Sequence, residues 1–124
     1  MTAFYEKLIR PVLFQTDPER MHNAAVRACE WAGRSSLARR AASRLWSFRD
    51  DRLRQDIAGI RFANPLGVAA GFDKNGRAIH FLGAMGFGHV EIGSVSAWVS
   101  HGNPRPRLFR IPRDQGIVVY YGVP

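Results

Sequence analysis

Apolar residues recur every three or four positions up to about residue 54, and short apolar runs alternate with glycine-rich turns beyond it. The first pattern is typical of amphipathic helices, whereas the second is typical of strands that alternate with turns and short helices. We therefore predict a helical region over residues 1–54 and an α/β region over residues 55–124.

Two helices are predicted in the first third of the chain. One covers Phe4–Leu13, and Pro11 is expected to kink it or to end it early, because proline lacks the backbone N–H that a helix needs. The next begins at Asp17-Pro18-Glu19, where an acidic cap precedes a proline and a first-turn acid. Gly33 is expected to end this second helix.

A third helix, which Ser35 or Ser36 would cap, has an apolar side and a basic side. Its basic side carries Arg39, Arg40 and Arg44. A basic amphipathic helix fits either an anchor on an anionic membrane or a helical cap that packs on the rest of the protein. The pattern alone favours the packed cap, because helices of globular proteins show the same amphipathic spacing.

Two consecutive βα units are predicted in the second region, after a small hairpin around Gly59. The first unit has a buried strand over Leu66–Ala70 and a helix over Arg77–Met85. The second begins with a strand over His89–Ser96. Because consecutive βα units usually place their strands parallel and adjacent, we expect the carboxyl ends of the two strands to lie side by side.

The end of the first strand has the composition of a ligand site. Its side chains shrink through Ala69, Ala70 and Gly71, so that a flat group can approach the backbone closely. Asp73 and Lys74 follow at the strand tip, where α/β sheets place their chemistry. A lysine in a loop is more often simply solvated, but its place beside a buried strand favours a function.

Composition narrows the possible partners. The net charge of +8 favours anionic partners such as phosphates, lipid head groups or nucleic acid. No interleaving of aromatic and basic residues marks a nucleic-acid surface, so we expect no nucleic-acid partner. The one cysteine, Cys29, rules out an internal disulfide and a cysteine-based metal cluster, and no metal site is predicted. No apolar run is long enough to span a bilayer, and no signal peptide is recognisable.

Four blocks of the sequence, in the same order and with similar spacing, resemble the amino-terminal part of the quinone-dependent (class 2) dihydroorotate dehydrogenases. These blocks are Ala69–Gly76, Gly83–Gly88, Val90–Val95 and Gly102–Arg110. The resemblance implies the first βα units of a (β/α)8 TIM-type barrel, incomplete in this chain, behind an amino-terminal helical region. It also implies a flavoprotein of pyrimidine biosynthesis that oxidises (S)-dihydroorotate to orotate, with FMN as cofactor and a membrane quinone as acceptor.

The resemblance also assigns residues and a location. Backbone contacts to the flavin fall on Ala70, Gly71, Phe72 and Asp73, and the Ser94 hydroxyl matches a flavin hydrogen bond. Lys74 matches a lysine that touches both flavin and substrate. The quinone-tunnel residues are His22, Arg110 and Tyr121. In this class the helical region lies on an anionic membrane surface, so the resemblance reverses the preference for a packed cap and implies a peripheral enzyme on the cytoplasmic side.

The chain departs from the family pattern in two respects. Val119 stands where many members have an asparagine that contacts the substrate amide, and valine cannot make that hydrogen bond. A complete barrel needs about 250 residues, so the catalytic base is expected beyond Pro124 and the isolated 124-residue chain is expected to be inactive. Two alternatives remain: a basic module that binds membrane or nucleic acid without catalysis, and a fragment without function.

Overall fold

The computed structural model describes residues 2–123, which fall into two compact units. One unit combines the residues up to Ala25 with those from Ser96 onward, and the other consists of Val26–Val95. Each unit is described separately below. The predicted boundary at residue 54 divides the chain by expected function, whereas the two units divide it by compactness. The predicted boundary therefore stays a prediction.

Residues 2–14 form one uninterrupted run of helical turns. The run consists of α1 (Thr2–Phe4), a π-helical stretch (Tyr5–Ile9) and α2 (Arg10–Phe14). The expected early break at Pro11 is therefore wrong. The Arg10 N–H bonds to the Tyr5 carbonyl in the wider π-helical pattern, and the run continues past Pro11, which lies in the first turn of α2.

The caps of the next two helices are confirmed. In α3 (Pro18–Arg34) the Asp17 carboxylate accepts the backbone N–H of Arg20 at 2.8 Å. In α4 (Ser36–Trp46) the Ser35 hydroxyl oxygen accepts the N–H of Ala38 at 3.2 Å. Both side chains satisfy an N–H group that the first turn of a helix leaves without a partner.

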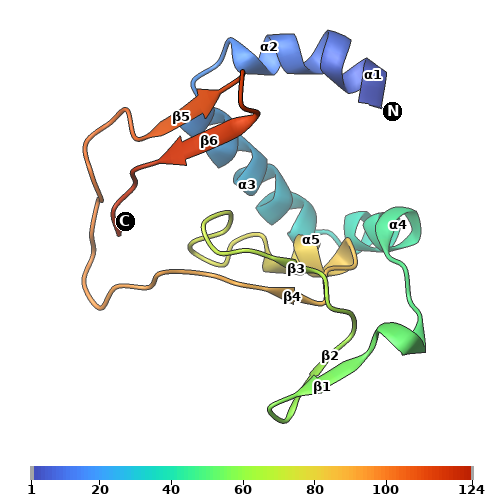
Figure 1. Ribbon diagram of the computed structural model, residues 1–124. Helices are drawn as coiled ribbons and strands as arrows, with labels where there is room; N and C mark the ends of the chain where they lie inside the picture. Colours follow the sequence, from blue (N-terminus) through green and yellow to red (C-terminus); the bar gives the residue numbers. More distant parts are fainter. Residues whose placement is uncertain (1, 124) are drawn as a thin grey trace. The chain divides into compact units, whose positions relative to one another are not determined.

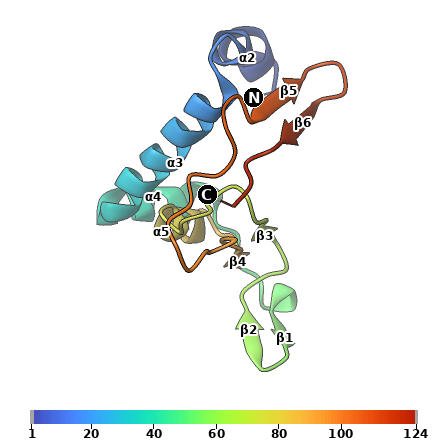
Figure 2. The same cartoon turned by 90° about the vertical axis from the view of Figure 1, so that its left-hand side faces the viewer.

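The second unit contains a hairpin and a pair of parallel strands. The predicted hairpin consists of β1 (Gln55–Ile57) and β2 (Ile60–Phe62), and it projects away from α4 and α5 (Figures 1 and 2). The parallel strands are β3 (Gly67–Val68) and β4 (His89–Val90), joined through α5 (Ile79–Ala84).

All three elements of the βα units are shorter than the sequence pattern predicts. The strand expected over Leu66–Ala70 is only Gly67–Val68, and Leu66 is 64% exposed rather than buried. Within the described residues β3 pairs with β4 alone, so one edge lacks a neighbouring strand that would extend and cover it. The strand expected over His89–Ser96 ends at Val90 for the same reason.

A small apolar core holds the second unit together. Its buried apolar residues are Val26, Ala42, Ala78 and Leu82, from α3, α4, α5 and the turn before α5. Gly33 lets α3 approach α5 closely, because a Cβ at this position would lie 3.3 Å from the backbone nitrogen of Phe81. Packing of the helices therefore fixes the position of α5 behind the two parallel strands.

The first unit contains an antiparallel hairpin that the sequence pattern did not predict. It pairs β5 (Leu108–Ile111) with β6 (Gly116–Val119) and lies beside the start of α3 (Figure 1). With its helices and three two-stranded sheets, the described chain has the predicted α/β character. The barrel that these units would begin stays a prediction.

Candidate functional site

The tips of the two parallel strands are hydrogen-bonded to each other. The Gly93 N–H donates to the Lys74 carbonyl at 3.2 Å, and closer to the strands the Glu91 N–H donates to the Val68 carbonyl at 2.9 Å. Ser94 directly follows Gly93, so it lies next to the loop that carries Lys74. The expectation that the two tips lie side by side is confirmed.

The backbone at the tip of β3 is open on one side. Ala70 and Gly71 are exposed, whereas Phe72 and Lys74 are half-buried. Gly71 has φ +98°, and no atom lies within 4 Å of the position that a Cβ would take there. A side chain would both strain this backbone and fill the space above it. The residues present therefore fit a flat aromatic ring that rests against the backbone.

The Asp73 side chain has a structural role that the sequence analysis missed. Its carboxylate is 1% exposed and accepts the backbone N–H groups of Arg77 at 2.9 Å and Ala78 at 2.6 Å. These bonds hold the Lys74 loop against the turn before α5. The helix predicted from Arg77 begins at Ile79. The capping signals of the sequence could not reveal this role, because the N-cap of α5 is Ala78, five residues beyond Asp73, and no side chain caps it.

Cys29 lies near this buried carboxylate. Burial raises the pKa of the Cys29 thiol, and the negative charge of Asp73 raises that pKa further. The thiol of this half-buried residue is therefore kept protonated and unreactive.

In the first unit, Arg110 connects the hairpin to the segment before α3. Its Nη1 donates to the Thr16 carbonyl at 2.8 Å, and its guanidinium lies 4.6 Å from the centre of the Phe14 ring. A cation over an aromatic face is attracted by the negative charge density of the ring. Arg110 is thus held in a defined position rather than solvated, as a basic loop residue would be.

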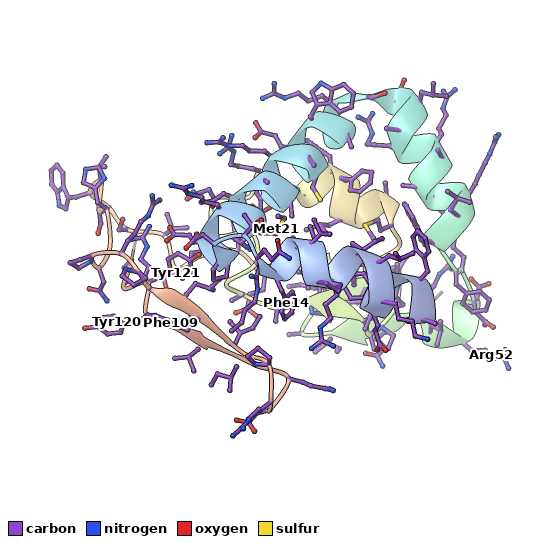
Figure 3. The ribbon with its side chains drawn as sticks, turned by 90° about the horizontal axis from the view of Figure 1, so that it is seen from above. Phe14, Met21, Arg52, Phe109, Tyr120 and Tyr121 are labelled. Carbon is purple, nitrogen blue, oxygen red and sulfur yellow. The ribbon has the colours of Figure 1, made fainter. Side chains whose placement is uncertain are left out.

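Tyr121 lies on the side of the hairpin that faces α3, whereas Tyr120 lies on the other side and is 67% exposed (Figure 3). The guanidinium of Arg107 is 4.9 Å from the centre of the Tyr121 ring. Burial raises the pKa of the Tyr121 phenol, and the carboxylate of Glu19 adds to this effect. The phenol is therefore neutral over the physiological pH range.

His22 is half-buried on α3, one helical turn after Glu19. The three predicted tunnel residues thus belong to the first compact unit, and the six predicted flavin residues belong to the second. Sequence reasoning did not select Glu19 or Arg107 for a site, because their contact joins positions far apart in the chain.

Comparison with known proteins identifies the family. The sequence model of dihydroorotate dehydrogenase matches residues 52–124, which is more than half of the chain. The chain belongs to the dihydroorotate dehydrogenase family. It is 45% identical over 118 residues to dihydroorotate dehydrogenase (quinone) of Roseiflexus sp. (strain RS-1), covering 95% of this chain and 32% of that protein. Its identity to the corresponding Acidithiobacillus ferrooxidans protein is 45% over 117 residues, covering 94% of this chain and 32% of that protein.

Solved structures of the dihydroorotate dehydrogenase family agree with this assignment. The chain is similar to DHODH from Eimeria tenella in complex with ferulenol, with a TM-score of 0.71 and 32% identity. That similarity covers 90% of this chain and 29% of the Eimeria chain. The chain thus spans about a third of the length of the curated relatives it matches.

Both units carry exposed apolar residues on their helices. In the first unit these are Phe4, Leu8 and Val12 of the amino-terminal helical run, each more than 60% exposed. In the second unit Leu37 and Leu45 of α4 are more than 70% exposed. No helix within residues 2–123 combines the length and apolar character that crossing a membrane requires.

Proposed function

We propose that this chain is the amino-terminal part of a quinone-dependent dihydroorotate dehydrogenase. The whole protein would oxidise (S)-dihydroorotate to orotate in pyrimidine biosynthesis, with FMN as cofactor and a membrane quinone as electron acceptor. The identity to proteins of that name supports the proposal. The observation that carries it is the Gly93–Lys74 hydrogen bond, which brings the six predicted flavin residues together around an open backbone.

FMN, when bound, would supply the chemistry that accepts a hydride from the substrate and passes two electrons to quinone. Ala70, Gly71, Phe72 and Asp73 would support the flavin ring through their backbone. The Lys74 ammonium would stabilise negative charge at the ring and hold the substrate carboxylate. The Ser94 hydroxyl would add a hydrogen bond from the neighbouring strand tip.

The second substrate would meet the first unit. We assign the quinone tunnel to His22 on α3 and to Arg110 and Tyr121 on the β5–β6 hairpin. Arg110 and Tyr121 are supported by the contacts of Arg110 with Phe14 and Thr16 and of Arg107 with the Tyr121 ring. A fixed cation and a neutral phenol suit a ligand that has carbonyl oxygens and an apolar ring.

We also assign the helical region, residues 1–54, to the surface of an anionic membrane on its cytoplasmic side. On α4 the exposed Leu37 and Leu45 lie on the apolar side of the helix, and the exposed Arg40 and Arg44 lie on the adjoining basic side. The amino-terminal helical run has an exposed apolar face as well. An apolar face bordered by arginines suits insertion at the boundary between lipid tails and anionic head groups.

The proposal is tested on the complete protein expressed from its gene, with the isolated 124-residue chain as a comparison. We expect the purified protein to show a flavin absorbance spectrum, bleaching on addition of dihydroorotate, and recovery on addition of quinone. The isolated chain should show no turnover. A complete protein that lacks flavin, or whose flavin dihydroorotate does not bleach, would contradict the proposal and favour a non-catalytic binding module or a fragment without function.

A further inference from the structure

In the first compact unit, a buried acid on the first turn of α3 binds two arginines of the segment before β5. Glu19 is 5% exposed, and its Oε1 accepts from Nε of Arg107 at 3.2 Å and from Nη2 at 2.9 Å. Arg105 Nη2 lies 3.2 Å from the same oxygen. The Arg107 side chain is 11% exposed and that of Arg105 is 66% exposed, so the Arg107 contact is the buried one.

Arg107 connects this acid to the backbone of its own segment. Its Nη1 donates to the His101 carbonyl at 2.6 Å and to the Asn103 carbonyl at 3.0 Å. Its guanidinium also lies over the Tyr121 ring. With two nitrogens on Glu19, one on the backbone and a ring below its plane, the guanidinium has one defined orientation.

The same segment also fixes the backbone on both sides of Tyr121. The Tyr120 N–H donates to the Arg107 carbonyl at 2.7 Å, and the Asn103 N–H donates to the Tyr121 carbonyl at 2.8 Å. The Asn103 side-chain amide donates to the Tyr120 carbonyl at 3.1 Å. The ring and the backbone of Tyr121 therefore both depend on the segment that Glu19 holds against α3.

We propose that Glu19 is a positioning residue for the quinone substrate, because it fixes Tyr121 against α3 through Arg107. Glu19 itself lies one helical turn before His22 on α3. This inference rests on the proposed function, which assigns Tyr121 and His22 to the quinone tunnel. Glu19 acts on the second substrate and not on the first, because every contact described above lies within the first unit.

An ion pair that only stabilises the fold would have different consequences. Loss of such a pair lowers stability and affects both half-reactions to the same extent, or neither of them. Loss of a positioning contact instead raises the KM for quinone and leaves flavin reduction unchanged, since a displacement of about 1 Å can cost up to a hundredfold in rate. The two roles are therefore separable by kinetics.

The test uses the complete holoprotein and the substitution Glu19→Gln, which keeps the side-chain shape and removes the charge. Glu30→Gln is the matched control, because Glu30 also lies on α3 and also pairs with two arginines, Arg34 and Arg77. We expect kcat/KM for quinone to fall about tenfold or more in E19Q. Flavin reduction by dihydroorotate should stay within about twofold of the unmodified protein, and E30Q should leave quinone kinetics unchanged.

Three further measurements extend the test, and the first of them does not require that E19Q folds. Arg107→Lys retains the positive charge but loses the planar fork, and it should reproduce the rise in quinone KM. The double variant of E19Q and R107K should be no worse than the more affected single variant, because both substitutions disrupt one contact. The phenol of Tyr121, followed by tyrosinate absorbance against a Tyr121→Phe reference, should titrate at lower pH in E19Q and not in E30Q.

The outcomes distinguish this inference from the function on which it rests. Unmodified protein without quinone turnover would overturn the proposed function and the inference with it. Active unmodified protein, with E19Q and R107K both at normal quinone KM, would overturn the inference alone. Equal slowing of flavin reduction and of quinone reduction would also overturn it, because the pair would then serve only the fold.

Discussion

The carboxylate of Asp73 accepts the backbone N–H of Ala78 at 2.6 Å, and both residues are almost completely buried. The same carboxylate takes the N–H of Arg77, so one side chain satisfies two donors at the start of α5. Lys74 directly follows this anchor. The loop that carries the predicted flavin contacts is therefore fixed by an aspartate whose side chain is buried in the protein and only whose backbone belongs to the predicted flavin site.

Asp73→Ala should destabilise the protein by about 2 kcal/mol, because it leaves one buried and one partly buried N–H group without their acceptor. The midpoint of denaturant unfolding measures this change. Asn75→Ala, at an exposed position in the same loop, is the control and should change the free energy of unfolding by less than about 0.5 kcal/mol. Equal effects of the two substitutions would show that the two hydrogen bonds of the Asp73 carboxylate do not stabilise the fold.

Lys74→Ala in the complete protein should slow flavin reduction about a hundredfold, or about 3 kcal/mol in activation free energy. The reason is the loss of a cation placed where negative charge develops. Stopped-flow bleaching of the flavin by dihydroorotate measures this step, and the exposed neighbour Asn75→Ala serves as its control. Flavin reduction at the normal rate in Lys74→Ala would remove Lys74 from the proposed site.

His22→Ala should weaken quinone use and leave flavin reduction by dihydroorotate nearly intact, because α3 is assigned to the second substrate. The two half-reactions are separated by stopped-flow reduction followed by reoxidation with quinone. Asn23→Ala, an exposed neighbour on α3, should leave both rates unchanged. If His22→Ala slowed flavin reduction as much as Lys74→Ala does, the division of roles between helices and strand tip would be wrong.

Stability of the protein should decrease in acid through Glu19. The hydrogen bonds from Arg107 hold the pKa of the Glu19 carboxyl below its ordinary value, despite the opposing effect of burial, and the positive charges of Arg107 and Arg105 act in the same direction. A lowered folded-state pKa means that the unfolded chain binds the proton first. This contribution is therefore complete above the ordinary pKa of a glutamate and is lost as pH falls through the lowered value.

Urea unfolding across this acidic range measures the effect, with Glu19→Gln as the variant that lacks the titrating group. The loss of stability on acidification should be smaller in E19Q than in the unmodified protein. Glu30→Gln keeps Glu19 and should retain the full loss. An identical acid response in E19Q and the unmodified protein would show that the Glu19 pair is not linked to folding.

Binding to membranes should depend on the arginines of α4. The complete protein should bind vesicles that contain anionic lipid, and binding should weaken as salt rises, because salt screens the attraction between arginines and head groups. Substitution of Arg40 and Arg44 by glutamine should reduce binding in a vesicle sedimentation assay. The matched control replaces the exposed Arg54 and Arg61, which lie outside α4. Equal binding to neutral and anionic vesicles would contradict the prediction.

Local signals in the sequence predicted the starts of α3 and α4 and the turn of the β1–β2 hairpin correctly. Asp17 and Ser35 cap their helices because a side-chain oxygen needs only the next few residues to find a backbone N–H. The turn of the β1–β2 hairpin has positive φ at Ala58 and Gly59, a conformation that glycine adopts without strain. In each case the interacting groups are within four residues of each other.

The strand lengths and the second hairpin were not predictable in the same way. An apolar run such as Leu66–Ala70 becomes a strand only as far as a neighbour pairs with it, and here the pairing extends over two residues. Residues 108–119 hold two short apolar runs without clear alternation, so the sequence pattern did not reveal that Leu108–Ile111 pairs with Gly116–Val119. Pairing partners, rather than propensity, determined both results.

The sequence by itself determined the family, the helix caps, and the open glycine backbone at the tip of the first strand, because each depends on residue types within a short stretch. Only the tertiary structure decided which distant groups meet. The Gly93–Lys74 bond joins the two strand tips, and the Glu19–Arg107 pair joins residues separated by 88 positions. Such contacts form where helix packing and strand pairing bring distant backbone segments together. A pattern within a short stretch of sequence therefore does not predict them.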